Sequence, residues 1–165
     1  MSEVSIRDAV ADDLPGIIAL SETVAAEGRW IGMQSPIDVQ RVTDRFLAHV
    51  SGSDQLSLVA ISPDGAVVGQ LQMAAAPYGV ADLGMMLAAD FRGQGLGRRL
   101  LDRGIAWASA RPDLHKLELQ VWPHNAAAIA LYRSAGFEQE GYLQRHYRRR
   151  NGEIWDAVIM GRQLA

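Results

Sequence analysis

The sequence predicts a mixed α/β fold (α+β in some schemes), in which helices cover the faces of one mixed sheet. Two observations predict it. Short segments whose apolar residues alternate with polar ones are interspersed with longer segments whose apolar residues recur at every third or fourth position. Glycine, proline or asparagine stands at most junctions between them. In chain order the segments give the succession βααβββαβαββ, which supplies strands and helices to one packed core.

The chain opens with a strand and two helices. Residues 4–6 alternate like a short strand. An aspartate, Asp12 or Asp13, can cap the helix that follows, which runs to about Ala26 with a proline in its first turn. A second helix is predicted over residues 35–52, opened by a serine–proline pair and ended by a glycine.

The middle of the chain reads as three strands and a third helix. The strands are predicted at residues 56–61, 67–73 and 80–87, and a Pro-Asp-Gly turn at residues 63–65 makes the first two a hairpin. A glycine-rich turn follows the third of these strands and leads into a helix that ends near Ala110.

The last third of the chain combines a strand, a helix and a hairpin. Residues 117–121 alternate as a strand, and residues 125–135 form a helix whose C′ position is a glycine. A long polar strand over residues 137–150 and a strand over residues 154–160 flank an Asn-Gly pair, which is typical of a type I′ hairpin turn.

Length and charge restrict the class of protein. The 165 residues correspond to one domain, residues 1–165, since a domain has about 150 residues. A formal net charge of −3, from 16 basic and 19 acidic side chains, gives no general attraction to nucleic acid or to an anionic membrane. The N-terminus lacks the apolar stretch of a signal peptide, and no apolar run approaches the ~18 residues of a membrane span. We therefore expect a cytoplasmic protein.

The absence of cysteine excludes several chemistries. The chain has no disulfide framework, no thiolate metal site and no cysteine nucleophile, so an acyl group cannot rest on a thiol of the protein. The four histidines show no metal-ligand spacing, and no metal site is expected.

The clearest chemical signal is the sequence Arg-Gly-Gln-Gly-Leu-Gly at residues 92–97, between a predicted strand and a predicted helix. Glycines at alternate positions let the backbone approach a ligand closely, and unpaired N–H groups at a helix N-terminus favour a phosphate. Arg98 and Arg99 add positive charge beside it. The loop lacks the Lys-Ser/Thr of a Walker A motif, and its glycine spacing differs from that of a Rossmann fingerprint. The loop therefore predicts a site for a phosphate-bearing ligand that is neither a Walker A nor a Rossmann nucleotide-binding site.

This loop resembles the R/Q-x-x-G-x-G/A loop of the GNAT N-acetyltransferase superfamily. The likeness extends to residues 83–87, where the family has its fourth strand, and to residues 125–137, which match its N-x-x-A-x-x-x-Y-x-x-x-G-F segment. Residues 150–160 resemble the amino-acid N-acetyltransferase and phosphinothricin-acetyltransferase-like branch. The resemblance spans essentially the whole chain. It implies a mostly antiparallel sheet with helices on both faces, and an N-acetyltransferase (an acyltransferase) that uses acetyl-CoA.

The resemblance also implies where acetyl-CoA binds. Backbone amides of the glycine loop would hold its pyrophosphate, and the backbone of the preceding strand would pair with its pantetheine arm like an added strand. Gly84 would mark a bulge that separates this strand from residues 117–121. The implied cofactor-binding residues are Met85, Met86, Leu87, Arg92, Gly93, Gln94, Gly95, Leu96, Gly97, Arg98, Asn125 and Tyr132.

The chemistry at the thioester is assigned by the resemblance to Tyr132 and an acidic residue. About two helical turns separate Asn125 from Tyr132, so they share a helix face, and Asn125 also suits the helix N-cap. In the family such a tyrosine donates a proton or a hydrogen bond to the departing thiolate, and a phenol with a pKa of about 10 suits a thiol with a pKa of about 8.5. The general base for the amine is implied to be Asp82, acting through a water, with Asp156, His146 and water alone as alternatives.

The acceptor side is the least defined part of the site. Trp30 and Ile31 lie where the family places the acceptor wall. The arginines at 145 and 148–150 could bind a carboxylate, but they are rather expected to form a solvated face or to protect an edge strand. We expect the acceptor to be a small primary amine, an amino acid in the first place, attacked directly in a ternary complex. The alternatives are a protein N-terminal or antibiotic acetyltransferase, and a non-catalytic CoA-binding sensor; family analogy also points to a homodimer.

Overall fold

The strands form one seven-stranded sheet in the order β1-β2-β3-β4-β5-β7-β6, in a computed structural model that describes residues 3–164. Every neighbouring pair is antiparallel except β4 and β5, which run parallel. The strands are β1 (Ser5–Asp8), β2 (Gln55–Ile61), β3 (Val67–Ala75), β4 (Val80–Leu87), β5 (Lys116–Val121), β6 (Glu138–Arg148) and β7 (Ile154–Gln163). The predicted α/β fold with a mixed, mostly antiparallel sheet is therefore confirmed.

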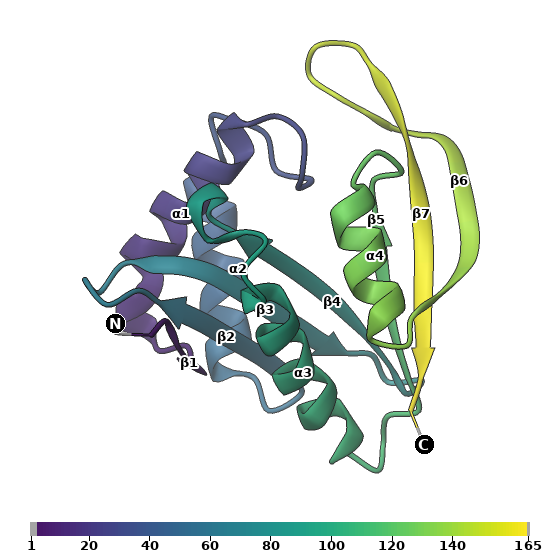
Figure 1. Ribbon diagram of the computed structural model, residues 1–165, viewed down its shortest axis with the longest axis horizontal. Coiled ribbons are helices and arrows are strands. Elements are labelled where there is room, and N and C mark those ends of the chain that lie inside the picture. The colour runs from purple at the N-terminus through teal and green to yellow at the C-terminus, as the bar shows by residue number, and fades with distance from the viewer. Residues whose placement is uncertain (1–2, 165) are drawn as a thin grey trace.

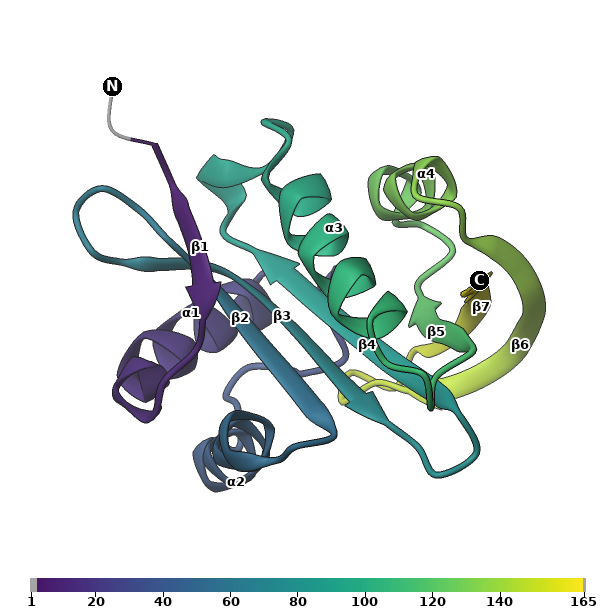
Figure 2. The same ribbon diagram turned by 90° about the horizontal axis from the view of Figure 1, so that it is seen from below.

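Helices cover both faces of this sheet (Figure 1). Figure 2 shows α1 (Leu14–Ala26) and α2 (Val39–Ser51) on one face, and α3 (Leu96–Ser109) and α4 (Ala126–Ser134) on the other. We call them the α1/α2 face and the α3/α4 face. The larger apolar core includes the fully buried side chains of Leu71, Leu100, Leu117 and Met160. Within residues 3–164 no helix is long and apolar enough to cross a membrane.

The first helix begins at a buried aspartate, as expected, but that residue does not cap it through its side chain. Asp13 occupies the N-cap position of α1. Its carboxylate instead accepts two hydrogen bonds of 2.8 Å from Arg7, and one from the backbone N–H of Val10. The helix is followed by Gly28, whose φ of 71° suits glycine. Asp13 therefore joins β1 to the start of α1.

The second helix begins later than the sequence predicted. α2 starts at Val39, because the carboxylate of Asp38 accepts a hydrogen bond of 3.0 Å from the backbone N–H of Arg41. The predicted start at residues 35–36 was wrong, since the side chain that caps the helix is that of Asp38. The helix ends at Gly52, as expected.

The last hairpin is less regular than its sequence suggests. β6 shifts register against β7 twice within residues 139–147. The predicted type I′ turn was wrong, because Gly152 has a φ of 91° whereas Asn151 does not have a positive φ. The N–H of Arg149 bonds the carbonyl oxygen of Glu153 at 2.7 Å, across a loop one residue longer than a type I′ turn. This longer loop carries arginines whose positions matter below.

Candidate active site

β4 and β5 lie side by side only at their N-terminal ends. Their pairing runs from Val80 opposite Lys116 to Asp82 opposite Glu118 and stops there. Beyond that point the strands diverge (Figure 1), so the second half of each has a backbone edge that no strand pairs with among the described residues. The predicted bulge at Gly84 was wrong, because β4 pairs with β3 through this residue without a register shift. The strands part without a bulge.

Along the free edge of β4, only every second residue directs its backbone N–H and C=O groups away from β3. Hydrogen bonds to β3 at both ends of β4, among them one of 2.8 Å from the N–H of Ala88, turn the backbone groups of even-numbered residues towards β3. Leu83, Met85 and Leu87 therefore direct their backbone groups towards the diverging β5. Met86 belongs to the paired set and its side chain is buried, so its backbone does not offer the predicted pantetheine contact.

The loop after β4 presents a row of unpaired backbone N–H groups. Gly93 and Gly95 have φ values of 72° and 83°, and Gly95 is the N-cap of α3. From Gly93 to Arg98, no backbone N–H finds an acceptor within residues 3–164. At Gly97 an added Cβ would lie 3.1 Å from Cδ2 of Leu131, so glycine lets α4 approach α3 closely. These N–H groups and the positive end of the helix dipole form the phosphate site that the sequence predicted.

The arginines of this loop already have partners. Arg92 forms a two-bond ion pair with Glu27, at 2.7 and 2.8 Å, and also donates to the carbonyl oxygen of Leu87. Arg98 and Arg99 each pair with an acidic side chain as well. The side-chain charge that the sequence suggested for phosphate binding is therefore largely balanced within the protein. The backbone N–H groups remain as the main phosphate-binding feature.

Tyr132 lies on α4, with its side chain in the core of the α3/α4 face. It is 7% exposed, and its ring centroid lies 5.7 Å from that of Phe137. Burial raises the pKa of Tyr132 to about 12, with no hydrogen-bond partner among the described residues contributing. Asn125 has the N-cap role foreseen for it, because its Oδ1 accepts a hydrogen bond of 3.2 Å from the N–H of Ala128.

The raised pKa changes the chemistry expected of Tyr132. Because burial disfavours the phenolate, full proton transfer from Tyr132 to a thiolate is less favourable than it would be from an exposed phenol with a pKa of about 10. A neutral phenol still donates a strong hydrogen bond to a developing negative charge. Tyr132 therefore suits hydrogen-bond stabilisation of a leaving thiolate better than outright protonation.

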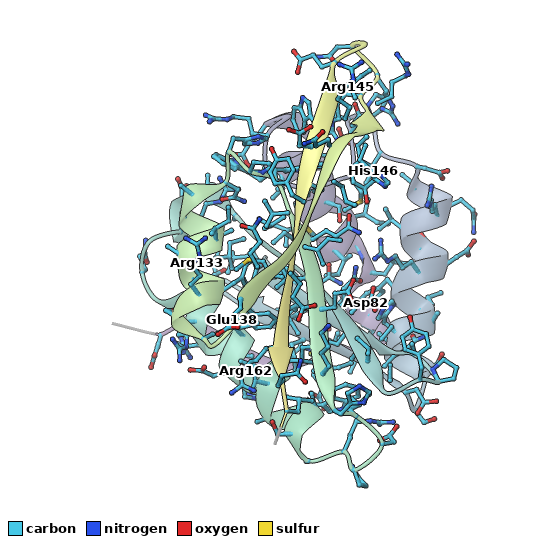
Figure 3. The ribbon with its side chains drawn as sticks, turned by 90° about the vertical axis from the view of Figure 1, so that its right-hand side faces the viewer. Asp82, Arg133, Glu138, Arg145, His146 and Arg162 are labelled. Carbon is cyan, nitrogen blue, oxygen red and sulfur yellow. The ribbon has the colours of Figure 1, made fainter. Side chains whose placement is uncertain are left out.

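Asp82 and Glu118 occupy the last paired position of β4 and β5. Paired residues of parallel strands point to the same side of a sheet, so the two carboxylates lie together where the strands part. Asp82 is exposed (Figure 3), and strand alternation puts it on the same face as Met86, which packs against α1. The sequence singled out Asp82 but missed Glu118, because only the strand pairing reveals it.

The two other candidate bases lie on the outer hairpin. The carboxylate of Asp156 accepts hydrogen bonds of 2.6 Å from the backbone N–H of Arg145 and from a tyrosine hydroxyl, and these bonds lower its pKa. His146 projects from β6, with its ring centroid 4.7 Å from that of Tyr147 (Figure 3). Asp156 therefore anchors the irregular part of β6, and Asp82 is the better placed of the acidic candidates.

The loop between α1 and α2 bridges the diverging strands. Trp30 and Ile31 pack against a buried cluster that includes Met86, in the free half of β4. On the other side, the carbonyl oxygen of Arg29 lies 2.6 Å from Nε2 of His124, just before α4. The two predicted acceptor-wall residues therefore lie beside the opening between the strands. His124 was missed by the sequence reasoning, since nothing local marks it.

Arg149 contradicts the solvated face predicted for the arginines of the last hairpin. Its neighbours in sequence are exposed, but Arg149 is only 7% exposed. Its guanidinium carbon lies 4.4 Å from the ring centroid of Trp155 and 5.3 Å from that of Trp122. Nη1 donates a hydrogen bond of 3.0 Å to the carbonyl oxygen of Gly32, in the loop between α1 and α2. Trp155 belongs to β7 of the same hairpin, whereas Trp122 and the loop come from segments far away in the sequence.

Comparison with known proteins identifies the family. A model of the Acetyltransferase (GNAT) family matches residues 23–137, which contain the glycine loop, the diverging strands and Tyr132. The chain belongs to the GNAT acetyltransferase family. This GNAT member is therefore an N-acetyltransferase, as the sequence predicted.

Two relatives of this GNAT acetyltransferase act on amino acids or their analogues, by their names. The L-amino acid N-acetyltransferase AaaT of Escherichia coli K12 is 31% identical over 166 residues, covering 98% of this chain and 99% of that protein. The L-methionine sulfoximine/L-methionine sulfone acetyltransferase of Pseudomonas paraeruginosa is 33% identical over 144 residues, covering 84% of this chain and 83% of that protein.

Solved structures show the same fold. A GNAT-family acetyltransferase from Streptococcus pneumoniae has a TM-score of 0.87 at 26% identity, covering 98% of this chain and all of that one. A phosphinothricin acetyltransferase from Sinorhizobium meliloti, in complex with AcCoA, has a TM-score of 0.86 at 24% identity, covering 99% of this chain and 90% of that one.

The residues present fit acetyl-CoA, the co-substrate of GNAT acetyltransferases. The unpaired N–H groups of residues 93–98 suit its pyrophosphate. The free backbone edge at Met85 suits an extended pantetheine arm, while the carbonyl oxygen of Leu87 is already bonded to Arg92. In the described part of the chain, no three His, Asp or Glu side chains gather as a metal site would require.

Proposed function

We propose that this chain transfers the acetyl group of acetyl-CoA to the α-amino group of a free amino acid, by direct attack in a ternary complex. The observation that supports this proposal most is that donor-binding and acidic side chains lie on opposite faces of the sheet where β4 and β5 diverge. The phosphate-binding loop and Tyr132 belong to the α3/α4 face, whereas Asp82 and Glu118 project on the α1/α2 face. Donor and acceptor can therefore meet between β4 and β5 from opposite sides.

The names of the relatives support an amino acid as acceptor. The Escherichia coli relative, matched along almost its whole length, is an L-amino acid N-acetyltransferase, and the Pseudomonas relative acts on methionine sulfoximine and methionine sulfone. A small acceptor also agrees with Trp30 and Ile31 beside the free half of β4, where they restrict the room on the acceptor side.

The reaction requires a proton acceptor for the amine on one face of the sheet and a hydrogen-bond donor for the leaving thiolate on the other. The α-amine of a free amino acid is mostly protonated at neutral pH, so it must lose a proton before its nitrogen can attack. Asp82, with Glu118 beside it, accepts that proton through a water. A C–N bond then forms as the C–S bond breaks, the attacking nitrogen releases its remaining surplus proton to water, and Tyr132 donates a hydrogen bond to the departing thiolate.

Direct transfer agrees with the absence of cysteine. An acyl-enzyme pathway through a thioester would need a cysteine thiolate as nucleophile, and the chain has no cysteine. The amine itself is the nucleophile, and a ternary complex brings it to the thioester.

We also propose the domain extent, the cellular location and the oligomeric state of the enzyme. We place the activity in one domain, residues 1–165, in the cytoplasm, where acetyl-CoA is available as donor. Family analogy supports a homodimer, which size-exclusion chromatography with light scattering would test.

A screen for thiol release tests the acceptor. Purified protein and acetyl-CoA are incubated with each proteinogenic amino acid, with short peptides, with polyamines and with aminoglycosides, and free CoA is measured. We expect turnover with amino acids. A response to peptides alone would favour a protein N-terminal acetyltransferase, and a response to aminoglycosides alone an antibiotic-modifying enzyme. Tight CoA binding with no turnover at all would favour a sensor.

A further inference from the structure

Arg149 is a buried cation that forms no ion pair within residues 3–164, although the carboxylate of Glu153 lies near enough to act on its charge. It is 7% exposed, and burial lowers its pKa, although an arginine remains charged near neutral pH. Its only side-chain hydrogen bond within residues 3–164 is the one to the carbonyl oxygen of Gly32. Other arginines of the described chain, such as Arg7, Arg92 and Arg111, pair with carboxylates. A buried charge without such a partner is unfavourable, so a site that keeps one calls for a further interaction.

The free part of the guanidinium is held in a fixed orientation. The faces of Trp122 and Trp155 lie next to it, and Gly32 binds Nη1, so Nε and Nη2 of Arg149 are left without an acceptor. These atoms are not among the fully enclosed unpaired polar atoms of the described residues, so they keep contact with solvent. The result is a planar donor edge that is rigid and still reachable.

This edge belongs to the acceptor side of the site. Trp155 pairs with Tyr147 across β6 and β7, and the hydroxyl of Tyr147 bonds the side chain of Gln120 on β5. Strand alternation puts Gln120 on the same face as Glu118, the α1/α2 face, where Asp82 also lies. The loop that Arg149 holds through Gly32 is the one that carries Trp30 beside the free half of β4.

We propose that the guanidinium of Arg149 binds the carboxylate of the amino-acid acceptor and so determines that the enzyme prefers free amino acids to neutral amines. The inference rests on the proposed function, since it names what holds the acceptor that function requires. A guanidinium edge matches a carboxylate with two parallel hydrogen bonds, and stacking on indole rings keeps it oriented for that purpose. The phosphates of acetyl-CoA have their own site at residues 93–98, at the start of α3.

The test compares two acceptors that differ only in the carboxylate. L-methionine and L-methioninamide are assayed for kcat/KM with the wild type, Arg149→Met, Arg149→Lys and Arg150→Met. Arg150 is the matched control, because it is exposed and also donates to the loop between α1 and α2, at the carbonyl oxygens of Gln34 and Pro36. Each variant is compared with the wild type on the same substrate, so the different basicity of the two amines cancels.

We expect Arg149→Met to lower kcat/KM for the amino acid about 10- to 100-fold, the range of a hydrogen bond to a charged group, and to change that for the amide less than about threefold. Arg149→Lys should keep part of the preference for the carboxylate, and Arg150→Met should leave the preference unchanged. Equal losses on both substrates would overturn the proposal, because they would mean that Arg149 only supports the loop. An unchanged preference in Arg149→Met would overturn it too.

A binding measurement separates this inference from the proposed function. N-acetyl-L-methionine and its carboxamide are titrated into the CoA-bound protein by calorimetry, with tryptophan fluorescence followed in parallel, since Trp122 and Trp155 lie against the guanidinium. Binding of the acid that is lost in Arg149→Met supports the carboxylate site even if no amine is acetylated. Equal binding of acid and amide, or of wild type and variant, would refute it even if amino acids are substrates.

Discussion

Replacing Tyr132 by phenylalanine removes one oxygen atom and tests the role of the phenol directly. The ring is buried against Phe137 and stays, while the hydroxyl has no partner among the described residues. The variant should therefore fold with a free energy of unfolding within about 0.5 kcal/mol of the wild type at neutral pH.

The expected loss of activity follows from the altered pKa of Tyr132. Because the value of about 12 disfavours full proton transfer, we assign the residue a single hydrogen bond to the leaving thiolate. Such a bond to a charged group contributes about 1.5–3 kcal/mol, which corresponds to a decrease in kcat of roughly 10- to 150-fold. A true general acid would allow a larger loss, up to about 10⁴-fold.

Steady-state thiol release at saturating amino acid and acetyl-CoA measures kcat, and calorimetry measures CoA affinity, which should not change. Tyr78→Phe is the control, because Tyr78 is 75% exposed. A kcat for Tyr132→Phe within twofold of the wild type, with acetyl transfer shown to be rate-limiting by the absence of a burst, would remove Tyr132 from the mechanism.

The same pair of proteins gives a stability test at alkaline pH. The folded-state pKa of about 12 lies above the unfolded value of 10.0, so the stabilising contribution of Tyr132 is complete below pH ~10 and is lost as pH rises towards 12. By pH 11 the wild type should have lost about 1.4 kcal/mol that Tyr132→Phe does not lose, measured by denaturant unfolding. Equal losses would contradict the burial of this hydroxyl.

Three further outcomes are expected. Gly95→Ala should lower the free energy of unfolding by about 1–2 kcal/mol and raise KM for acetyl-CoA, because the φ of 83° at the phosphate site disfavours alanine. Gly84→Ala is the control, because Gly84 does not have a positive φ. Equal KM values for the two variants would refute the role of Gly95 in phosphate binding. Asp82→Asn should lower kcat/KM and alter the pH–rate profile, and an identical profile would assign proton removal to water or to another base. Arg7→Ala should cost about 1 kcal/mol at neutral pH by leaving the buried carboxylate of Asp13 without its partner. Since Arg7 lowers the pKa of Asp13, that difference should disappear as pH falls well below the ordinary value of 3.8, and its persistence in acid unfolding would argue against the ion pair.

Patterns within short sequence segments were enough to predict most of the helices and strands. The strand predicted at residues 80–87 is β4 with the observed bounds, and Gly28 and Gly52 end the first two helices as expected, because strand and glycine-stop signals act within a few residues. The start of α2 was placed too early, since Ser-Pro and Asp38 are both good start signals and only the hydrogen bond to Arg41 decides between them. The glycine loop could likewise be predicted, because its chemistry lies in consecutive backbone groups.

Electrostatic partners could not be predicted in the same way. The sequence shows arginines around the phosphate loop, but it does not show that Glu27, far away in the chain, neutralises Arg92. It shows a run of arginines at the end of β6, but not that Trp122 and Trp155 enclose one of them. A charge is exposed or buried according to segments that meet only in three dimensions, so the local pattern predicted the wrong environment for Arg149.

These long-range contacts have a common consequence for the acceptor. The loop between α1 and α2 is bound to the end of β4 through Glu27 and Arg92, to the start of α4 through Arg29 and His124, and to the last hairpin through Arg149. Because Arg92 follows β4 and His124 follows β5, the loop contacts the ends of both diverging strands. We expect a substitution in any of these contacts to change the spacing of the strand ends as well as the position of the loop. We therefore expect the choice of acceptor to depend on these contacts as well as on the residues that touch the amine.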